Sequence, residues 1–181
     1  KEVRAYFNTP VAYIVAVAFL LVNGYFFAQP LFLAGQADID SFADLAPLLL
    51  TFLMPAVTMR HLAEEAKTGT IEVLRTLPVR DWEILLSKFL AALTLLAATL
   101  ALTLAYPAAV FLLGRPDPGA VAGTYAGLFL TGALFAAAGL FASSLTRNQV
   151  VAFIISFLIA FSIYVTGKVS YVDAEQERHL T

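Results

Sequence analysis

The sequence contains no cysteine and little charge. Asp, Glu, Lys and Arg make up 13% of its 181 residues, and there are two histidines. Without cysteine, the chain cannot form disulfide bonds, thiolate metal sites or a thiol nucleophile. The net charge of −2 gives no reason to expect a nucleic-acid partner. His61 and His179 stand far apart and form no metal-ligand spacing, so metal-dependent chemistry is not indicated.

Hydrophobic residues make up 60% of the chain, where a soluble domain is nearer to half. They gather in runs that approach or exceed the roughly 20 residues needed to cross a bilayer as a helix. The sequence therefore predicts an all-α polytopic membrane protein with five transmembrane helices. The predicted spans are residues 11–33, 45–59, 82–113, 120–145 and 149–166. Pro55 and Pro107 predict bends in two of them, whereas Pro47 fits a first turn.

The two ends of the chain are polar. In residues 1–10, Val3, Tyr6 and Phe7 share one side of a helix, which predicts a short interfacial helix leading into the first span. An ordinary basic flank of that span is the alternative. Residues 167–181 form a polar tail with no apolar run. Because the chain does not begin with Met, we expect residues to be missing before Lys1.

A charged segment separates the second and third spans. Residues 60–81 must lie in water, because lipid cannot solvate their charges. If this segment is cytoplasmic, eight of the eleven basic residues lie inside, as the positive-inside rule requires. The eight are Lys1, Arg4, Arg60, Lys67, Arg75, Arg80, Lys88 and Arg147. The N-terminus and residues 60–81 are therefore predicted to be cytoplasmic.

Within this segment the pattern predicts a short amphipathic helix. Thr70 fits its N-cap, and Ile71, Leu74 and Leu77 fall on one face. Pro78 ends it. Two interpretations stay open. It is either a simple interfacial helix or a rigid lever that fits a groove on a cytosolic partner.

The predicted spans hold no ionisable residue away from their flanks, which disfavours a proton- or ion-coupled carrier. No GxxxxGK[ST] loop is present, so the chain is not expected to be an enzyme, and ATP hydrolysis would require another polypeptide. His61 and Glu65 lie one helical turn apart but lack a third metal ligand. The serine and threonine hydroxyls of the spans either line a polar path or, more often, bond to their own helix carbonyls.

Small residues mark the fourth span. Their spacing allows two helix backbones to approach closely, either within one subunit or between two subunits. The glycines concerned are Gly119, Gly123, Gly127, Gly132 and Gly139.

Three segments resemble ABC-2 type transporter permeases, and in particular their gliding-motility-associated branch. These are the opening KEVRAYFNTPVAYI, the run from Met59 to Leu93, and LFASSLTRNQVVAF. The middle run carries a pattern of the form E-x-x-x-G-T-x-E-x-L-x-x-x-P followed by W-E. The matching residues are Glu65, Gly69, Thr70, Glu72, Leu74, Pro78, Trp82 and Glu83.

The resemblance implies the permease subunit of an exporter in the bacterial inner membrane. It implies a cytosolic ATPase partner that holds the ATP, a second permease copy (the same chain or a related one), and no cofactor in this chain. It also implies that a coupling helix at residues 70–76 contacts the ATPase, with Arg75 beside the motif residues. Six spans are typical of the family, so we expect the sixth to be missing from this sequence. A membrane scaffold without a transport path and a secondary carrier remain the alternatives.

Overall fold

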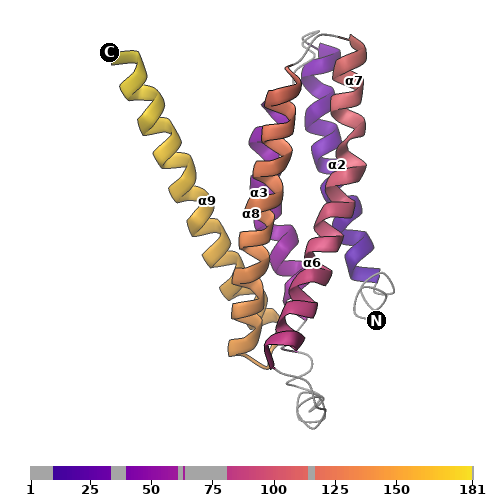
Figure 1. The fold of residues 1–181 in the computed structure, drawn as a ribbon, viewed down its shortest axis with the longest axis vertical. Helices are drawn as coiled ribbons and strands as arrows, with labels where there is room; N and C mark the ends of the chain where they lie inside the picture. Colours follow the sequence, from indigo (N-terminus) through magenta and orange to yellow (C-terminus); the bar gives the residue numbers. More distant parts are fainter. Residues whose placement is uncertain (1–9, 34–39, 61–62, 64–80, 114–116, 181) are drawn as a thin grey trace.

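The structure is a computed structural model, and it describes residues 10–33, 40–60, 63, 81–113 and 117–180. These residues form a helical bundle in which successive passes of the chain run in alternating directions (Figure 1). The helices are α2 (Pro10–Leu33), α3 (Asp40–Thr58), α6 (Asp81–Thr103), α7 (Ala105–Leu113), α8 (Pro118–Leu145) and α9 (Gln149–Leu180). We call the end that holds Arg60, Asp81 and the α8–α9 connection the loop end, and the opposite end the far end.

Several of these helices are apolar enough to lie in a bilayer. Among the described residues, Trp82–Leu112, Pro118–Leu145 and Gln149–Tyr171 have both the length and the composition to cross it. Tyr13–Gln29 and Phe42–Thr58 are shorter apolar helices. The predicted class, an all-α polytopic membrane protein, is confirmed.

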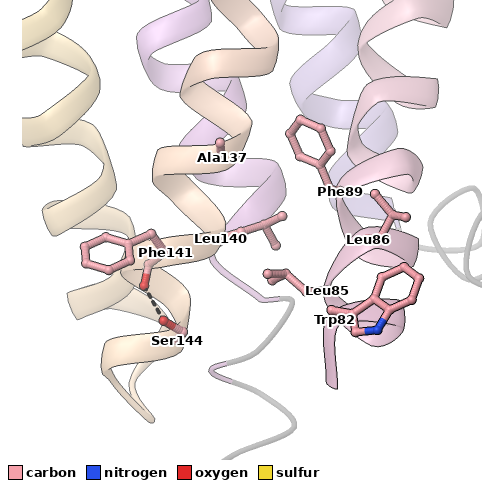
Figure 2. Close-up of a pocket in the computed structure, with 8 residues that line it drawn as sticks. All are labelled: Trp82, Leu85, Leu86, Phe89, Ala137, Leu140, Phe141 and Ser144. Carbon is pink, nitrogen blue, oxygen red and sulfur yellow. Dashed lines mark hydrogen bonds between the residues drawn. The ribbon is translucent and has the colours of Figure 1, made fainter. Parts of the chain in front are cut away.

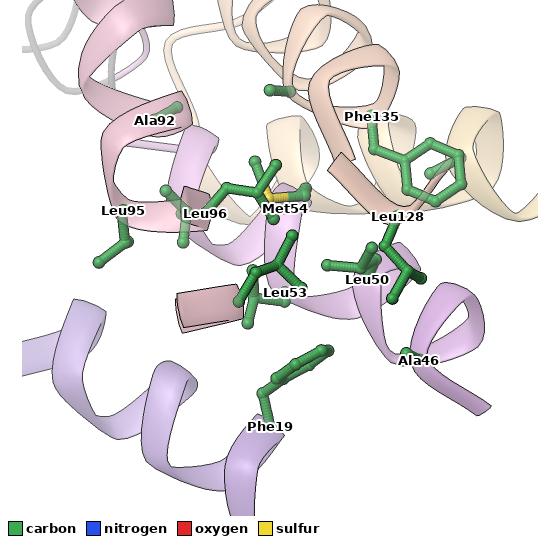
Figure 3. Packing of buried hydrophobic residues seen from close by; sticks show 14 of the residues in the cluster. Phe19, Ala46, Leu50, Leu53, Met54, Ala92, Leu95, Leu96, Leu128 and Phe135 are labelled. Carbon is green, nitrogen blue, oxygen red and sulfur yellow. The ribbon is translucent and has the colours of Figure 1, made fainter. Parts of the chain in front are cut away.

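Helix α3 is the centre of the bundle. It packs against α2, α8 and α9, while α8 also packs against α6. Leu50 and Met54 of α3 are fully buried, and they lie between side chains of the surrounding helices, such as Leu96 of α6 and Phe135 of α8 (Figure 3). Because α3 packs against several other helices of the bundle, a displacement of α3 would move side chains throughout the core.

Two helices differ from the predicted spans. Helix α3 begins at Asp40 rather than near Leu45, so Pro47 lies inside the helix and its predicted first-turn position is wrong. Helix α9 continues past Thr166 to Leu180, so a single helix carries the polar sequence that follows the fifth span. The predicted interfacial helix at residues 1–10 falls, apart from Pro10, outside the described residues.

The predicted bend near Pro107 is present as a break between α6 and α7 at Leu104. Proline has no N–H, so Pro107 leaves the carbonyl of Thr103 without its helical partner. The hydroxyl of Tyr125, on α8, donates to that carbonyl at 2.9 Å and also lies 3.0 Å from Thr103 Oγ1. A side chain from a neighbouring helix thus replaces the hydrogen bond that the proline removes.

Helix α7 is also joined to α2. The hydroxyl of Tyr106 donates to the carbonyl of Leu20 at 2.9 Å. A Cβ at Gly24 would lie 3.1 Å from that hydroxyl, so glycine permits this close approach. The rings of Phe27 and Phe42 pack against Tyr106, with centroid distances of 5.1 and 5.7 Å. These contacts hold the far ends of α2, α3 and α7 together.

The role of Tyr125 can be tested against Pro107. We expect Tyr125→Phe to lower the free energy of unfolding by about 1 kcal/mol, because a buried carbonyl loses its donor. In a Pro107→Ala background the cost should fall, because the substituted alanine supplies an N–H to the same carbonyl. Unfolding of the four proteins in detergent micelles completes the double-mutant cycle. Equal costs in both backgrounds would contradict the compensation.

Candidate functional site at the loop end

The predicted partner-binding residues lie on the chain between α3 and α6. All seven fall outside the described residues, and their roles stay predictions. They are Glu65, Gly69, Thr70, Glu72, Leu74, Arg75 and Pro78. The structure does describe how the chain leaves α3 and enters α6, and both points lie at the loop end (Figure 1). The site is therefore built from the described residues that hold these two points.

The exit from α3 is fixed to α8 by one hydroxyl. Ser143 Oγ accepts a hydrogen bond from the N–H of Ala63 at 3.0 Å. The same oxygen donates to the carbonyl of Met59 at 3.2 Å. Ala63 and Ser143 are both fully buried. Ser143 therefore satisfies two backbone groups where the helical ladder of α3 ends, and it sets where the following segment starts.

Next to this contact, α3, α8 and α9 meet with almost no space between them. A Cβ at Gly139 of α8 would overlap Thr58 Oγ1 of α3 and would lie 3.0 Å from Ser156 Oγ of α9. Thr58 Oγ1 donates to its own helix, to the carbonyl of Met54 at 2.8 Å. The buried hydroxyl of Ser156 has no hydrogen-bond partner among the described residues. Glycine at 139 is what allows α3 to lie directly against α8.

The first turn of α6 lies beside a pocket of about 510 Å³ between α6 and α8. Trp82, Leu85, Leu86 and Phe89 line one side, and Ala137, Leu140, Phe141 and Ser144 line the other (Figure 2). The hydroxyl of Ser144 donates to the carbonyl of Phe141 at 2.6 Å. Trp82 is 56% exposed, as expected for an indole at a membrane interface. Among the described residues that line the pocket, none is an acid, a base or a metal ligand.

Lys88 is a site residue whose position the sequence analysis did not foresee. It is only 2% exposed and has a partner, as a buried charge requires. It precedes Ala91, Ala92 and Leu95 on the buried face of α6. That helical spacing is a signal that Lys88 shares a face of α6 with these apolar residues.

Most hydroxyls of the spans bond to their own helix, as the more frequent of the two alternatives predicted. Ten do so: Thr51, Thr58, Ser87, Thr94, Thr99, Thr103, Thr124, Ser144, Ser162 and Thr166. Ser143 is different, because it bonds to the end of another helix. Among the described residues, no group of three His, Asp or Glu comes together as a possible metal site.

The five glycines of α8 have different surroundings. Gly132 faces Leu96, and Gly139 faces Thr58 and Ser156. At Gly123 and Gly127 an added Cβ would meet no atom within 4 Å, and at Gly119 it would meet only the side chain of Asp117. The two glycines nearer the loop end therefore pack against other helices, whereas Gly123 and Gly127 face open space.

Residues 28–173 match the family described as ABC-2 family transporter protein. The match covers most of the chain, which therefore belongs to this family, whose members are membrane subunits of ABC transporters. No match was found among curated proteins or among solved structures.

Removing the Ser143 hydroxyl should loosen the exit from α3. We expect Ser143→Ala to lower the free energy of unfolding by about 1–3 kcal/mol, because two buried backbone groups lose their partner. Ser144→Ala is the matched control, since Ser144 is exposed and donates to the carbonyl of Phe141 in its own helix. Its effect should stay within about 0.5 kcal/mol. Chemical unfolding in micelles measures both, and equal effects would refute the role of Ser143.

The glycines provide a second matched pair. Gly139→Ala should destabilise the chain by about 1–3 kcal/mol, because Thr58 sits close to its own backbone and cannot move away cheaply. Gly123→Ala should bring no penalty within the chain and a gain of up to about 1 kcal/mol from helix propensity. Thermal unfolding in micelles compares them. A loss of stability only in Gly123→Ala would show that the close contact lies elsewhere.

Proposed function

We propose that this chain is the membrane subunit of an ABC exporter that a separate cytosolic ATPase drives through residues 60–81. The observation that carries the proposal is the family match, because residues 28–173 include this segment. ATP hydrolysis is assigned to the partner, since the chain has no GxxxxGK[ST] loop. No cofactor is assigned to this chain.

The described contacts suggest how motion would pass from the ATPase to the membrane. In this proposal Glu72 and Arg75 contact the ATPase, and the chain on either side pulls on α3 and α6. Ser143 and Gly139 hold the loop end of α3 against α8, so α3 cannot move alone. Because α3 also packs against α2 and α9, the displacement would spread through the bundle.

The finer assignments follow from the sequence. We place the loop end in the cytoplasm of a bacterium, in line with the distribution of Lys and Arg. A second permease copy, identical or related, would complete the transport path. Membership of the gliding-motility-associated branch is proposed from the opening segment KEVRAYFNTPVAYI and the α8–α9 connection.

A site-specific photocrosslinker at position 72 tests the partner in native membranes. We expect it to capture a soluble protein that carries a phosphate-binding loop, because the residue is proposed to contact the ATPase directly. The control is the same crosslinker at Leu112, which is 87% exposed on α7 and lies near the far end. Capture of the same ATPase from both positions, or from neither, would argue against residues 60–81 as the contact surface.

A charge reversal gives an independent measure once the ATPase is known. Glu72→Arg should weaken the co-purification of the ATPase with this chain. The substitution places a second positive charge three residues from Arg75 on the proposed contact surface. Glu175→Arg makes the same change in the polar C-terminal part of α9 and should leave binding intact. If the two variants bind the ATPase equally, Glu72 is not part of the interface.

A further inference from the structure

Helix α9 diverges from the other helices of the bundle, and the separation grows toward the far end (Figure 1). Near the loop end its inward stripe is fully buried, at Ala152, Ser156 and Ala160. The same stripe continues along the helix to Gly167 and Tyr171. At Gly167, however, an added Cβ would meet no atom within 4 Å, and Tyr171 is 64% exposed. The inner face of α9 therefore borders open space in this region.

This space is a cleft of about 360 Å³ formed by α3, α8 and α9. Leu134 and Phe135 of α8 and Ile163 of α9 supply apolar walls. Two charged residues, Asp44 and Lys168, also line it. The cleft thus combines apolar walls with one positive and one negative charge, which suits an amphiphilic ligand better than a purely apolar one.

The two charges form an ion pair that keeps unused bonding capacity. Lys168 Nζ lies 2.6 Å from Asp44 Oδ1, and the side chains are 42% and 75% exposed. An ammonium group carries three N–H donors and a carboxylate carries two oxygens. One contact between them leaves donors on Lys168 and an oxygen on Asp44 available. A ligand that carries one positive and one negative group can therefore bind beside the pair while Lys168 and Asp44 stay in contact with each other.

We propose that this cleft binds a phospholipid with a phosphate–ammonium headgroup, taken from the leaflet at the far end. Lys168 donates to the phosphate and Asp44 accepts from the headgroup ammonium, in charge-assisted hydrogen bonds. Part of an acyl chain lies against Leu134, Phe135 and Ile163. The site goes beyond the proposed transport function and does not require the ATPase.

The charge pattern predicts which headgroup binds best. Phosphatidylethanolamine matches both members of the pair. Phosphatidylglycerol carries the phosphate but no cation for Asp44. Phosphatidylcholine carries a cation without N–H donors, so it cannot donate to the carboxylate. We expect phosphatidylethanolamine to bind about tenfold more tightly than either of the others, which corresponds to losing one charge-assisted hydrogen bond.

Headgroup selectivity is measured by native mass spectrometry of the full chain, released from nanodiscs of defined mixtures of the three lipids. Asp44→Asn should reduce phosphatidylethanolamine binding about tenfold and leave phosphatidylglycerol binding unchanged or stronger. Lys168→Gln should weaken both lipids, and Lys168→Arg should restore them. A merely structural role for the ion pair would make Asp44→Asn weaken the binding of all lipids alike, and that result would overturn the proposal.

A second pair of variants tests the cleft without altering charge. Gly167→Leu places a side chain in the open space and should reduce retention of phosphatidylethanolamine at least tenfold while the melting temperature holds or rises. Val165→Leu is the control, because Val165 is 40% exposed on α9 outside the cleft lining. Unchanged lipid retention in Gly167→Leu, or an equal loss in Val165→Leu, would overturn the proposal.

Discussion

The structure depends on one constraint, that hydrocarbon offers no hydrogen-bond partner to a backbone group. Wherever a helical ladder is interrupted, the protein itself must replace the missing bond. At the α6–α7 break, Tyr125 donates to the carbonyl that Pro107 leaves free. At the end of α3, Ser143 serves one carbonyl and one N–H together. These two side chains come from α8, so α8 both packs the core and stabilises the irregular points of two neighbouring helices.

The bundle is close-packed at the loop end and open at the far end of α9. Gly139 lets α3 lie against α8 beside Ser156, whereas Gly167 on α9 borders empty space. This asymmetry suits a membrane subunit that receives force on one side. A rigid loop end would transmit a displacement of residues 60–81 to the core. The looser far end holds the cleft beside Lys168 in which we propose that a lipid binds.

Much of this fold could be predicted from the sequence because the bilayer reduces the choices. A run of about 20 apolar residues is long enough to cross the bilayer as a helix, and a strongly charged segment lies outside the hydrocarbon. The predicted spans therefore resemble the observed helices, and Pro107 marks an actual break. The second predicted span begins near Leu45, whereas helix α3 begins at Asp40. The helix begins before the apolar run, so Asp40 and Asp44 lie in its first turns, at the far end of the bundle. Asp44 pairs there with Lys168.

The glycines of α8 illustrate the difference between what the sequence determines and what only the tertiary structure determines. The sequence by itself determined that the chain is helical, membrane-embedded and interrupted by one charged segment, since these follow from composition and spacing. It also showed a small-residue pattern along α8. Only the tertiary structure decided that Gly139 and Gly132 pack against other helices while Gly123 and Gly127 do not. The same holds for the buried position of Lys88 and for the ion pair between Asp44 and Lys168. Spacing along one helix defines a face, but which neighbour covers that face depends on how the other helices cross it.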